Sequence, residues 1–250
     1  AGVNGLIAAE LAAAGAQTAP RAFEGDAGFI RAFTRTIPDV GALRRRIGED
    51  WSLRRVAFKP FPVCAFNQTP VTAALALHAE IAGRPIGRVV VRMNPYVIGY
   101  AGMASTGPFR SLSATLMSIP FCVALALQHG RCTLAMMGAF DDAAVLRLVG
   151  AVTLTPDPAI PVLSAVIEAV LQDGTTLVRD QVMTSDDYAY DRGTVATLVR
   201  RIGVEEGVPG PAYDGLEQFV DDLPGSRIEQ AIAAFGMLPP ACLTGDRPAP

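Results

Sequence analysis

The chain has 250 residues, half of them hydrophobic, and a formal net charge of −3. This length can bury a sizeable core in one large domain or in two small ones. Because the arginines are scattered among acidic residues, the charge pattern argues against a surface for nucleic acid or for an anionic membrane.

The N-terminal part of the chain predicts helices. Residues 2–14 are small and apolar almost without interruption, which suits a close-packed helix that is buried on most sides. A turn with a short helix is predicted over residues 24–33, and another helix over residues 39–47. The sequence starts with neither a methionine nor the basic stretch and cleavage site of a signal peptide. We therefore expect it to begin inside a structural element, in the first segment, residues 1–50, of a helical domain.

The middle of the chain, residues 51–180, combines strand and helix patterns. Short segments rich in β-branched or apolar residues predict strands over residues 53–58, 86–93, 152–155, 165–171 and 175–179. Helical spacing and end signals predict helices over residues 71–82, 111–129 and 141–148. Thr69 is the expected N-cap of the first of these helices, with Pro70 at its first helical position, and Gly130 ends the second. The Asp-Gly pair in QDGT, residues 172–175, predicts a tight turn between the last two strands.

The pattern becomes helical again after residue 180. Helices are predicted over residues 194–202, 216–222 and 226–235. The order along the chain is thus helical, then α+β, then helical. This order predicts an α+β fold in which two flanking segments, residues 1–50 and 181–250, form one helical domain, with an α+β lid domain, residues 51–180, inserted between them.

Apolar stretches, cysteines and histidines set further expectations. The longest apolar stretches, residues 119–127 and 159–171, are too short or too interrupted to cross a bilayer, so we expect no membrane span. Four cysteines occur in the chain: Cys64, Cys122, Cys132 and Cys242. They show no CxxC spacing, which disfavours a zinc site and a disulfide scaffold, and a reducing cytoplasm is the expected location. His78 and His129 fall in separate predicted helices and are interpreted as structural, so no metal site is predicted.

Lys59 is the single lysine among the 21 lysine and arginine residues, within FKPFPVC, residues 58–64. A solvated surface position accepts either cation, but guanidinium stays charged in any protein setting, whereas the pKa of a lysine ammonium falls on burial. Burial lowers a lysine pKa to about 5–6 in extreme cases, which allows the neutral amine to act as a general base. We interpret Lys59 as a residue of a site that needs the amine. The alternative is a lysine in solvent at the end of a strand.

Four stretches stand in a fixed order along the chain: NGLIAAELAAAGAQTAPRAFEGDAGFIRAF, KPFPVCAFNQTPVTAAL, GPFRSLSATLMSIPFCVALALQHG and LQDGTT. In this order they resemble the second half of the MmgE/PrpD family, which includes 2-methylcitrate dehydratases, cis-aconitate decarboxylases and iminodisuccinate epimerases. The resemblance implies a large helical domain and a smaller α+β lid, with the active site in the cleft between them. It also implies a homo-oligomer, usually a dimer.

The same resemblance implies a function. It indicates a cofactor-independent lyase or isomerase that acts on a small di- or tricarboxylate, by removing a proton α to a carboxylate or by loss of water or CO2. The usual chain of the family is nearly twice as long, so we expect an N-terminal helical half, either in the same polypeptide or as a second one. The alternative is a non-catalytic lid-bearing subunit, or a degenerate homologue, that binds a partner half.

The resemblance assigns expected roles to individual residues. Lys59 matches the lid lysine of the family, which contacts a substrate carboxylate or takes part in proton transfer. Cys64 stands where cis-aconitate decarboxylases resemble this stretch but have histidine. Its thiol is either a soft acid–base group or, as we favour, a small apolar filler. Tyr100 lies near the lid tyrosine of the family and would donate to a substrate oxygen, and Tyr96 is its competitor for this role.

Two more residues are expected to bind substrate. Gln68 stands where many relatives have histidine, and its amide can bind a carboxylate or hydroxyl but cannot shuttle a proton near neutral pH. Arg110, in GPFRS, is able to clamp a carboxylate through two parallel hydrogen bonds. For Arg110 the interpretation that we favour is a solvated arginine at the start of a helix.

Overall fold

The structure is a computed structural model that describes residues 2–36, 39–45, 47–49 and 51–240. The chain divides into two compact units, Ala1–Val56 and Ala57–Pro250. This division falls close to the boundary expected at residue 51. The packing of the two flanking segments into one helical domain stays a prediction.

The first unit contains three short helices: α1 (Gly2–Ala13), α2 (Phe29–Thr34) and α3 (Val40–Arg45). All three were predicted, and no residue of α1 is buried within the described chain, so the burial expected for this helix stays a prediction. Its larger side chains, such as Leu6 and Ile7, are at least 48% exposed. The apolar composition of α1 therefore has no partner within the part of the chain that the structure describes.

The second unit is built on a mixed sheet of four described strands: β1 (Ile86–Met93), β2 (Val152–Pro156), β3 (Ala165–Leu171) and β4 (Thr176–Gln181). Their order across the sheet is β2-β1-β3-β4, with β1 and β2 parallel and the other pairs antiparallel. In the register, Val91 faces Leu154 on one side and Ile167 on the other. These four predicted strands are confirmed, because their β-branched residues fit a pleated, partly buried surface.

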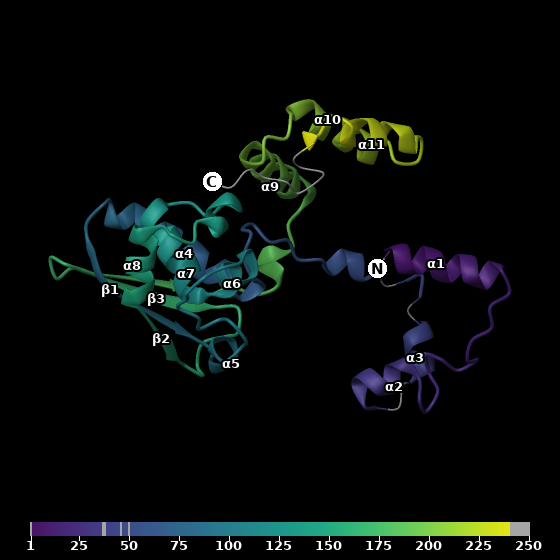
Figure 1. Cartoon of the computed structure of the whole chain (residues 1–250), viewed down its shortest axis with the longest axis horizontal. Helices are drawn as coiled ribbons and strands as arrows, with labels where there is room; N and C mark the ends of the chain where they lie inside the picture. Colours follow the sequence, from purple (N-terminus) through teal and green to yellow (C-terminus); the bar gives the residue numbers. More distant parts are fainter. Residues whose placement is uncertain (1, 37–38, 46, 50, 241–250) are drawn as a thin grey trace. The chain divides into compact units, whose positions relative to one another are not determined.

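Helices cover one face of this sheet, as Figure 1 shows. They are α4 (Gln68–Ile81), α7 (Ile119–His129) and α8 (Ala143–Ala151). Every residue of α7 from Ile119 to Leu127 is buried, so this helix forms the centre of the core. The other face carries exposed arginines, of which Arg88 pairs with Glu168 across β1 and β3. One face of the sheet is therefore buried and the other is solvated.

The strand predicted over residues 53–58 is wrong. The structure has a 3-10 helix, Ser52–Arg55, followed by extended backbone without a ladder. The described side chains from residue 51 to residue 57 are exposed, so nothing there packs a strand against the core. Within the second unit, Phe58 N–H donates to the Tyr188 carbonyl at 2.8 Å.

The single helix predicted over residues 111–129 is also wrong, because two helices occupy this range. The first is α6 (Leu112–Met117), and α7 begins after Ser118. The Ser118 hydroxyl accepts from Phe121 N–H as the N-cap of α7, and Pro120 occupies its first turn, where a proline is tolerated. The end predicted at Gly130 is confirmed, since this glycine has the left-handed conformation of a C-cap, with φ of 64°.

The start of α4 differs from the expected one by a short shift. The helix begins at Gln68, so its N-cap position is Asn67 and not Thr69. The Thr69 hydroxyl instead donates to the Leu163 carbonyl at 2.6 Å and pairs with the Tyr188 hydroxyl at 2.8 Å. Thr69 thus ties the first turn of α4 to two later segments of the chain.

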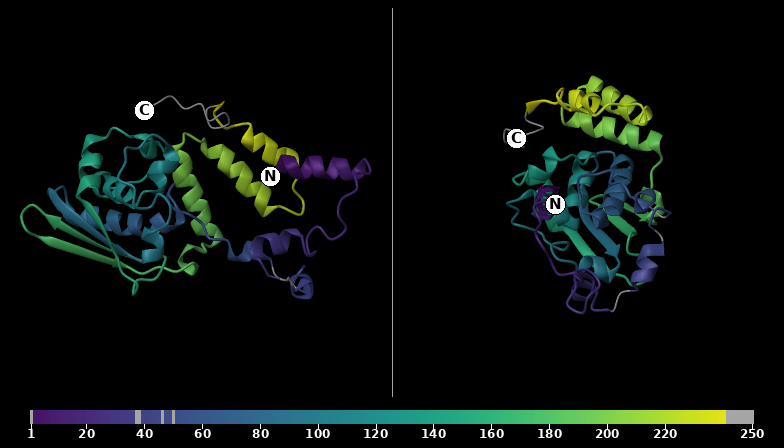
Figure 2. Two further views of the ribbon diagram at one scale, coloured as in Figure 1. Left: turned by 60° about the horizontal axis from the view of Figure 1, so that its bottom comes forward. Right: turned by 90° about the vertical axis from the view of Figure 1, so that its right-hand side faces the viewer.

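Three further helices follow the sheet: α9 (Arg192–Glu205), α10 (Gly210–Asp221) and α11 (Ile228–Phe235). Their prediction is confirmed, and α10 and α11 lie side by side (Figure 2). A Cβ atom on Gly203 would lie 1.4 Å from the Tyr213 hydroxyl, so only glycine permits this approach of α9 to α10. Arg200 joins the same two helices through ion pairs with Asp214 and Glu217. None of the helices in the described part of the chain is long and apolar enough to cross a bilayer.

Asp142 joins α7 to α8, and we expect it to make stability depend on pH. Its carboxylate accepts from the N–H groups of Ala144 and Val145 and contacts His129 Nε2 at 2.8 Å. The Val145 N–H, and then the His129 contacts, hold the Asp142 pKa below its usual value. The ionised carboxylate therefore stabilises the fold above the unfolded pKa of about 3.9, and this contribution is lost as pH falls through the lower folded pKa.

Urea unfolding at pH 7 should show that Asp142→Ala lowers the free energy of unfolding by about 1 kcal/mol, the usual cost of losing an N-cap. Asp142→Asn keeps the capping oxygen, so it should cost less and should remove the acid-dependent part of the stability. Equal stability of the Ala variant and the wild type would contradict this assignment.

Candidate functional site

A pocket of about 210 Å³ contains Lys59. One side is formed by Lys59 and the residues from Pro60 to Pro62, and another by Ile202, Glu205 and Glu206 near the end of α9. Cys132 and Leu134 complete the lining. The pocket therefore brings together the stretch at residue 59 and a helix that follows it by more than 130 residues in the sequence.

Lys59 is exposed at the edge of this pocket. Its ammonium has no hydrogen bond or ion pair within the ranges that the structure describes. It precedes Pro60, and a residue before proline is restricted to extended backbone. We call residues 58–62 the lysine segment. The side chain of Lys59 is thus available to a ligand, while its backbone is constrained by the sequence.

The amide of Gln68 holds the end of the lysine segment. Its Oε1 accepts from Phe61 N–H at 3.1 Å, and its Nε2 donates to the carbonyls of Phe61 and Val63, each at 3.0 Å. Gln68 is only 2% exposed. Because these bonds engage the amide on both of its polar atoms, the geometry gives Gln68 a positioning role in place of the substrate contact expected from the sequence.

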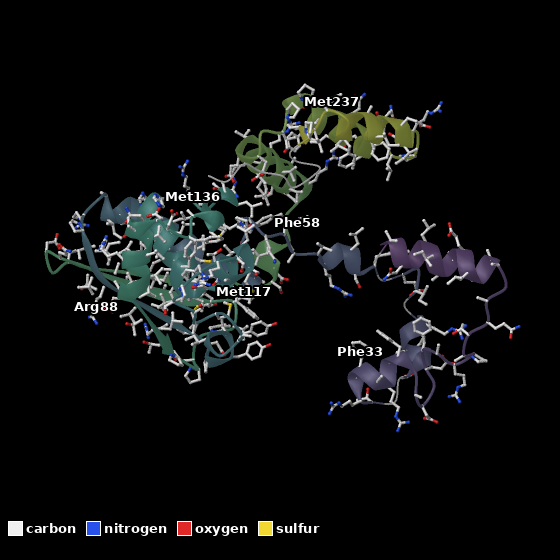
Figure 3. All side chains as sticks on the ribbon, in the orientation of Figure 1. Phe33, Phe58, Arg88, Met117, Met136 and Met237 are labelled. Carbon is white, nitrogen blue, oxygen red and sulfur yellow. The ribbon has the colours of Figure 1, made fainter. Side chains whose placement is uncertain are left out.

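Residues beyond the sheet hold the start of the lysine segment. Phe58, labelled in Figure 3, stacks on Tyr190 with ring centroids 6.3 Å apart and planes at 8°. Its backbone N–H donates to the Tyr188 carbonyl, as described above. The Tyr188 ring is buried, and burial raises the pKa of its hydroxyl above the ordinary value. This tyrosine is therefore a neutral structural group at physiological pH.

Arg201 of α9 holds the middle of the lysine segment. Its guanidinium donates to the Pro60 carbonyl and lies over the Phe61 ring, 5.6 Å from the centroid. No local sequence pattern indicates Arg201, Tyr188 or Tyr190, because their importance comes from contacts with residues far away in the chain.

Cys64 is half-buried, and its side chain packs against the core, which agrees with the filler role favoured from the sequence. Burial raises the pKa of the Cys122 thiol well above its ordinary value and that of Cys132 to about 12. Cys122 and Cys132 are therefore thiols at neutral pH. Cys242 lies outside the described residues. Among the residues described, no group of three or more His, Cys, Asp and Glu side chains is arranged to hold a metal ion.

Tyr100 and Tyr96 lie together, away from the lining of the Lys59 pocket. They follow or belong to the short helix α5 (Pro95–Ile98) and form an aromatic cluster with Phe66, with centroids 5.6–6.3 Å apart. Tyr96 is 61% exposed and Tyr100 is 46% exposed. The geometry therefore keeps both tyrosines as candidates for a ligand that approaches from outside.

Arg110 is exposed at the start of α6, which agrees with the solvated position favoured from the sequence. Its neighbour Phe109 is buried and packs on Phe121 with centroids 5.0 Å apart. The structure places Arg110 outside the lining of the Lys59 pocket.

A second pocket, of about 270 Å³, lies at the other end of α4 and includes His78, Arg84, Gln128 and Arg147. Two of these polar side chains, His78 and Arg84, bond to carbonyls near the ends of helices. Arg84 donates to the carbonyls of two residues in the last turn of α4, and His78 Nδ1 lies 2.8 Å from the Leu127 carbonyl. We favour the Lys59 pocket, because Lys59 does not end a helix and is the residue that the family resemblance marks as part of a site.

Comparison with known families identifies the part of the chain that contains the sheet. The model of the MmgE/PrpD C-terminal domain matches residues 61–201, which is more than half of the chain. The match begins two residues after Lys59 and ends at Arg201. No curated protein matches the sequence.

The role of Gln68 can be tested by stability. Gln68→Leu leaves the N–H and carbonyl of Phe61 and the carbonyl of Val63 without their side-chain partner, so we expect it to lower the free energy of unfolding by about 2 kcal/mol or more. Gln128→Leu, at a half-buried glutamine of α7, is the matched control and should cost less. Urea unfolding of both variants measures the difference, and equal costs would argue against the positioning role.

Proposed function

The chain belongs to the MmgE/PrpD family, and from this membership we propose that it is a lyase or isomerase that acts on a small di- or tricarboxylate. In this proposal the reaction starts with removal of a proton α to a carboxylate, or proceeds by loss of water or CO2, without a cofactor. The remaining helical half of the site comes from the same polypeptide or from a second one. The working protein is a homo-oligomer.

The observation that carries this proposal is the place of Lys59. The one lysine of the chain lies at the edge of a pocket with its ammonium exposed, and its backbone segment is bonded to Gln68, Tyr188 and Arg201. Such an ammonium is suited to bind a carboxylate and to stabilise the negative charge that develops when the adjacent carbon loses a proton. A fixed backbone keeps that charge in one place during the reaction.

The proposed reaction also requires that water be excluded from Lys59. An exposed ammonium is hydrated, and its electrostatic effect on a substrate is much weaker in water than in a closed site. The helical half expected from the family would supply this cover. Tyr100 is then the candidate donor to a substrate oxygen, with Tyr96 as the alternative.

A non-catalytic lid-bearing chain is the second candidate function, and two observations favour it. The Gln68 amide is occupied by backbone groups, so it does not offer the polar contact expected at that position. In addition, Glu205 and Glu206 line the same pocket as Lys59, and carboxylates repel a polycarboxylate substrate. Catalytic measurements on lysine variants distinguish the two functions.

We expect Lys59→Arg and Lys59→Ala, each in the complete protein, to lower kcat by at least about 10²-fold, the lower range for loss of a general acid or base. This expectation holds if Lys59 also takes part in proton transfer, the second role that the family resemblance implies, because arginine keeps the positive charge but cannot become a neutral base at accessible pH. Steady-state kinetics with citrate-like, aconitate-like and succinate-like acids provide the measurement.

An electrostatic role alone predicts a different result for Lys59→Arg. That variant would then keep most of kcat and show mainly a raised KM. Arg88→Lys, at an exposed position on β1, is the matched control and should leave both constants unchanged. Near-normal kcat in both Lys59 variants would refute the catalytic role and favour the lid-bearing alternative.

The two tyrosines can be separated by removing one hydroxyl at a time. Tyr100→Phe keeps the aromatic packing on Phe66 and should lower kcat by about 10²-fold if its hydroxyl stabilises charge on the substrate. Tyr96→Phe, in the same cluster, should leave kcat near the wild-type value. The reverse order of effects would assign the role to Tyr96.

A further inference from the structure

We propose that Arg201 is a positioning residue that holds the lysine segment in the conformation that presents Lys59 to the pocket. This inference rests on the proposed function, because it assigns the placement of the residue on which that function depends. Arg201 acts through the backbone of residues 60 and 61, and no contact of its own with a substrate is required.

The lysine segment is held by backbone hydrogen bonds on either side of Lys59. Before it, Phe58 N–H is bonded to the Tyr188 carbonyl. After it, the backbone of Phe61 is bonded to the buried amide of Gln68. Between these two points lies the Lys59–Pro60 pair, and proline offers no N–H for a further bond. Among the backbone groups of Lys59 and Pro60, the Pro60 carbonyl is the one for which a bond is present within the described residues.

Arg201 makes that bond and adds a second contact. Its guanidinium donates to the Pro60 carbonyl while it lies over the Phe61 ring, 5.6 Å from the centroid. The planar guanidinium is suited to both tasks at once, because it stacks on an aromatic face and still presents donors at its edge. A glutamine at this position keeps a donor but lacks the charge and the reach.

The bond from Arg201 to Pro60 also joins α9 to the residue that follows Lys59. Ile202 and Glu205, which follow Arg201 on the same helix, line the pocket together with Lys59. On its other side, Arg201 and Pro60 line a wider pocket of about 620 Å³ with Tyr190 and Thr194. Pro60, whose carbonyl accepts the bond from Arg201, therefore lines both pockets.

Arg200 provides a matched comparison on the same helix. Its guanidinium bonds to Glu217 at 2.7 Å and to Asp214 at 2.8 Å, so it ties α9 to α10. It thus supports the helices without contacting the lysine segment in the structure. Arg200→Gln and Arg201→Gln remove the same charge from neighbouring positions, but only the second removes a bond to that segment.

The experiment uses the fact that Lys59 is the one lysine. Reductive methylation of the protein with ¹³C-formaldehyde labels lysine and N-terminal amines, and the dimethyl-lysine NMR signal that is lost in Lys59→Arg reports on Lys59 alone. Loss of one hydrogen bond changes the ratio of held to released segment by about three- to tenfold. In Arg201→Gln we expect the signal to narrow and to move toward that of free dimethyl-lysine. Arg200→Gln should leave it at the wild-type position.

A second variant keeps the proposal testable if Arg201→Gln does not fold. Phe61→Leu removes the stacking partner of Arg201 and leaves its hydrogen bond, so the signal should move in the same direction by a smaller amount. An unchanged signal in the folded Arg201 and Phe61 variants, or an equal shift in Arg200→Gln, would overturn the proposal.

Activity gives an independent readout. If the proposed function holds, Arg201→Gln should lower kcat more than it raises KM, and Arg201→Lys should recover part of the loss. A shifted NMR signal without any turnover in the wild-type protein would keep the positioning role of Arg201 and reject the proposed function instead.

Discussion

The hydrogen bonds of the Gln68 amide are the constraint on which the candidate site depends. Gln68 is the first residue of α4, and its buried amide pairs with backbone groups of the preceding bend that would be costly to leave unpaired. By bonding to Phe61 and Val63 it fixes the lysine segment to a helix that packs directly on the sheet. The direction of the segment is therefore set by a helix whose residues belong to the core of the second unit. The side chain of Lys59 can remain exposed because its neighbours, and not the lysine itself, carry the packing.

The polar side chains at the two ends of α4 serve different purposes. At its beginning, buried amide and hydroxyl groups bond to distant segments, through Gln68 and through Thr69 with Tyr188. At its end, Arg84 bonds to carbonyls that would otherwise lack a partner, as is common at the last turn of a helix. A cation that ends a helix is already satisfied, whereas a cation next to a constrained bend is available. This contrast explains why an arginine-lined pocket is the weaker candidate and the pocket of Lys59 the stronger one.

The sequence was sufficient to predict most of the second unit. Strands β1 to β4 follow from short β-branched or apolar runs and from the Asp-Gly turn, and the end of α7 follows from Gly130. The sequence was less informative where one residue type can play two structural roles. Ser118 and Pro120 start a new helix within a stretch that was predicted as one continuous helix. Thr69 bonds to distant groups in place of capping α4. For the site, Lys59 was found from its uniqueness and from the family resemblance. Gln68 was predicted to bind substrate, whereas in the structure its amide bonds to the backbone of Phe61 and Val63. Arg201 and Tyr190 were missed because nothing in their local sequence indicates the partner that they meet.

The sequence separation of these contacts has a consequence for how the site is formed. Pro60 and Arg201 are 141 positions apart, and Thr69 and Tyr188 are 119 apart, so both contacts close very long loops. Contacts of this kind are slow to form, since the chain loses the entropy of the loop before the contact repays it. The bonds of Gln68 to Phe61 and Val63 span only five to seven positions and can form early. A newly made chain is thus expected to acquire its sheet and the bend at Gln68 before α9 arrives, so that the surroundings of Lys59 are among the last features to be completed.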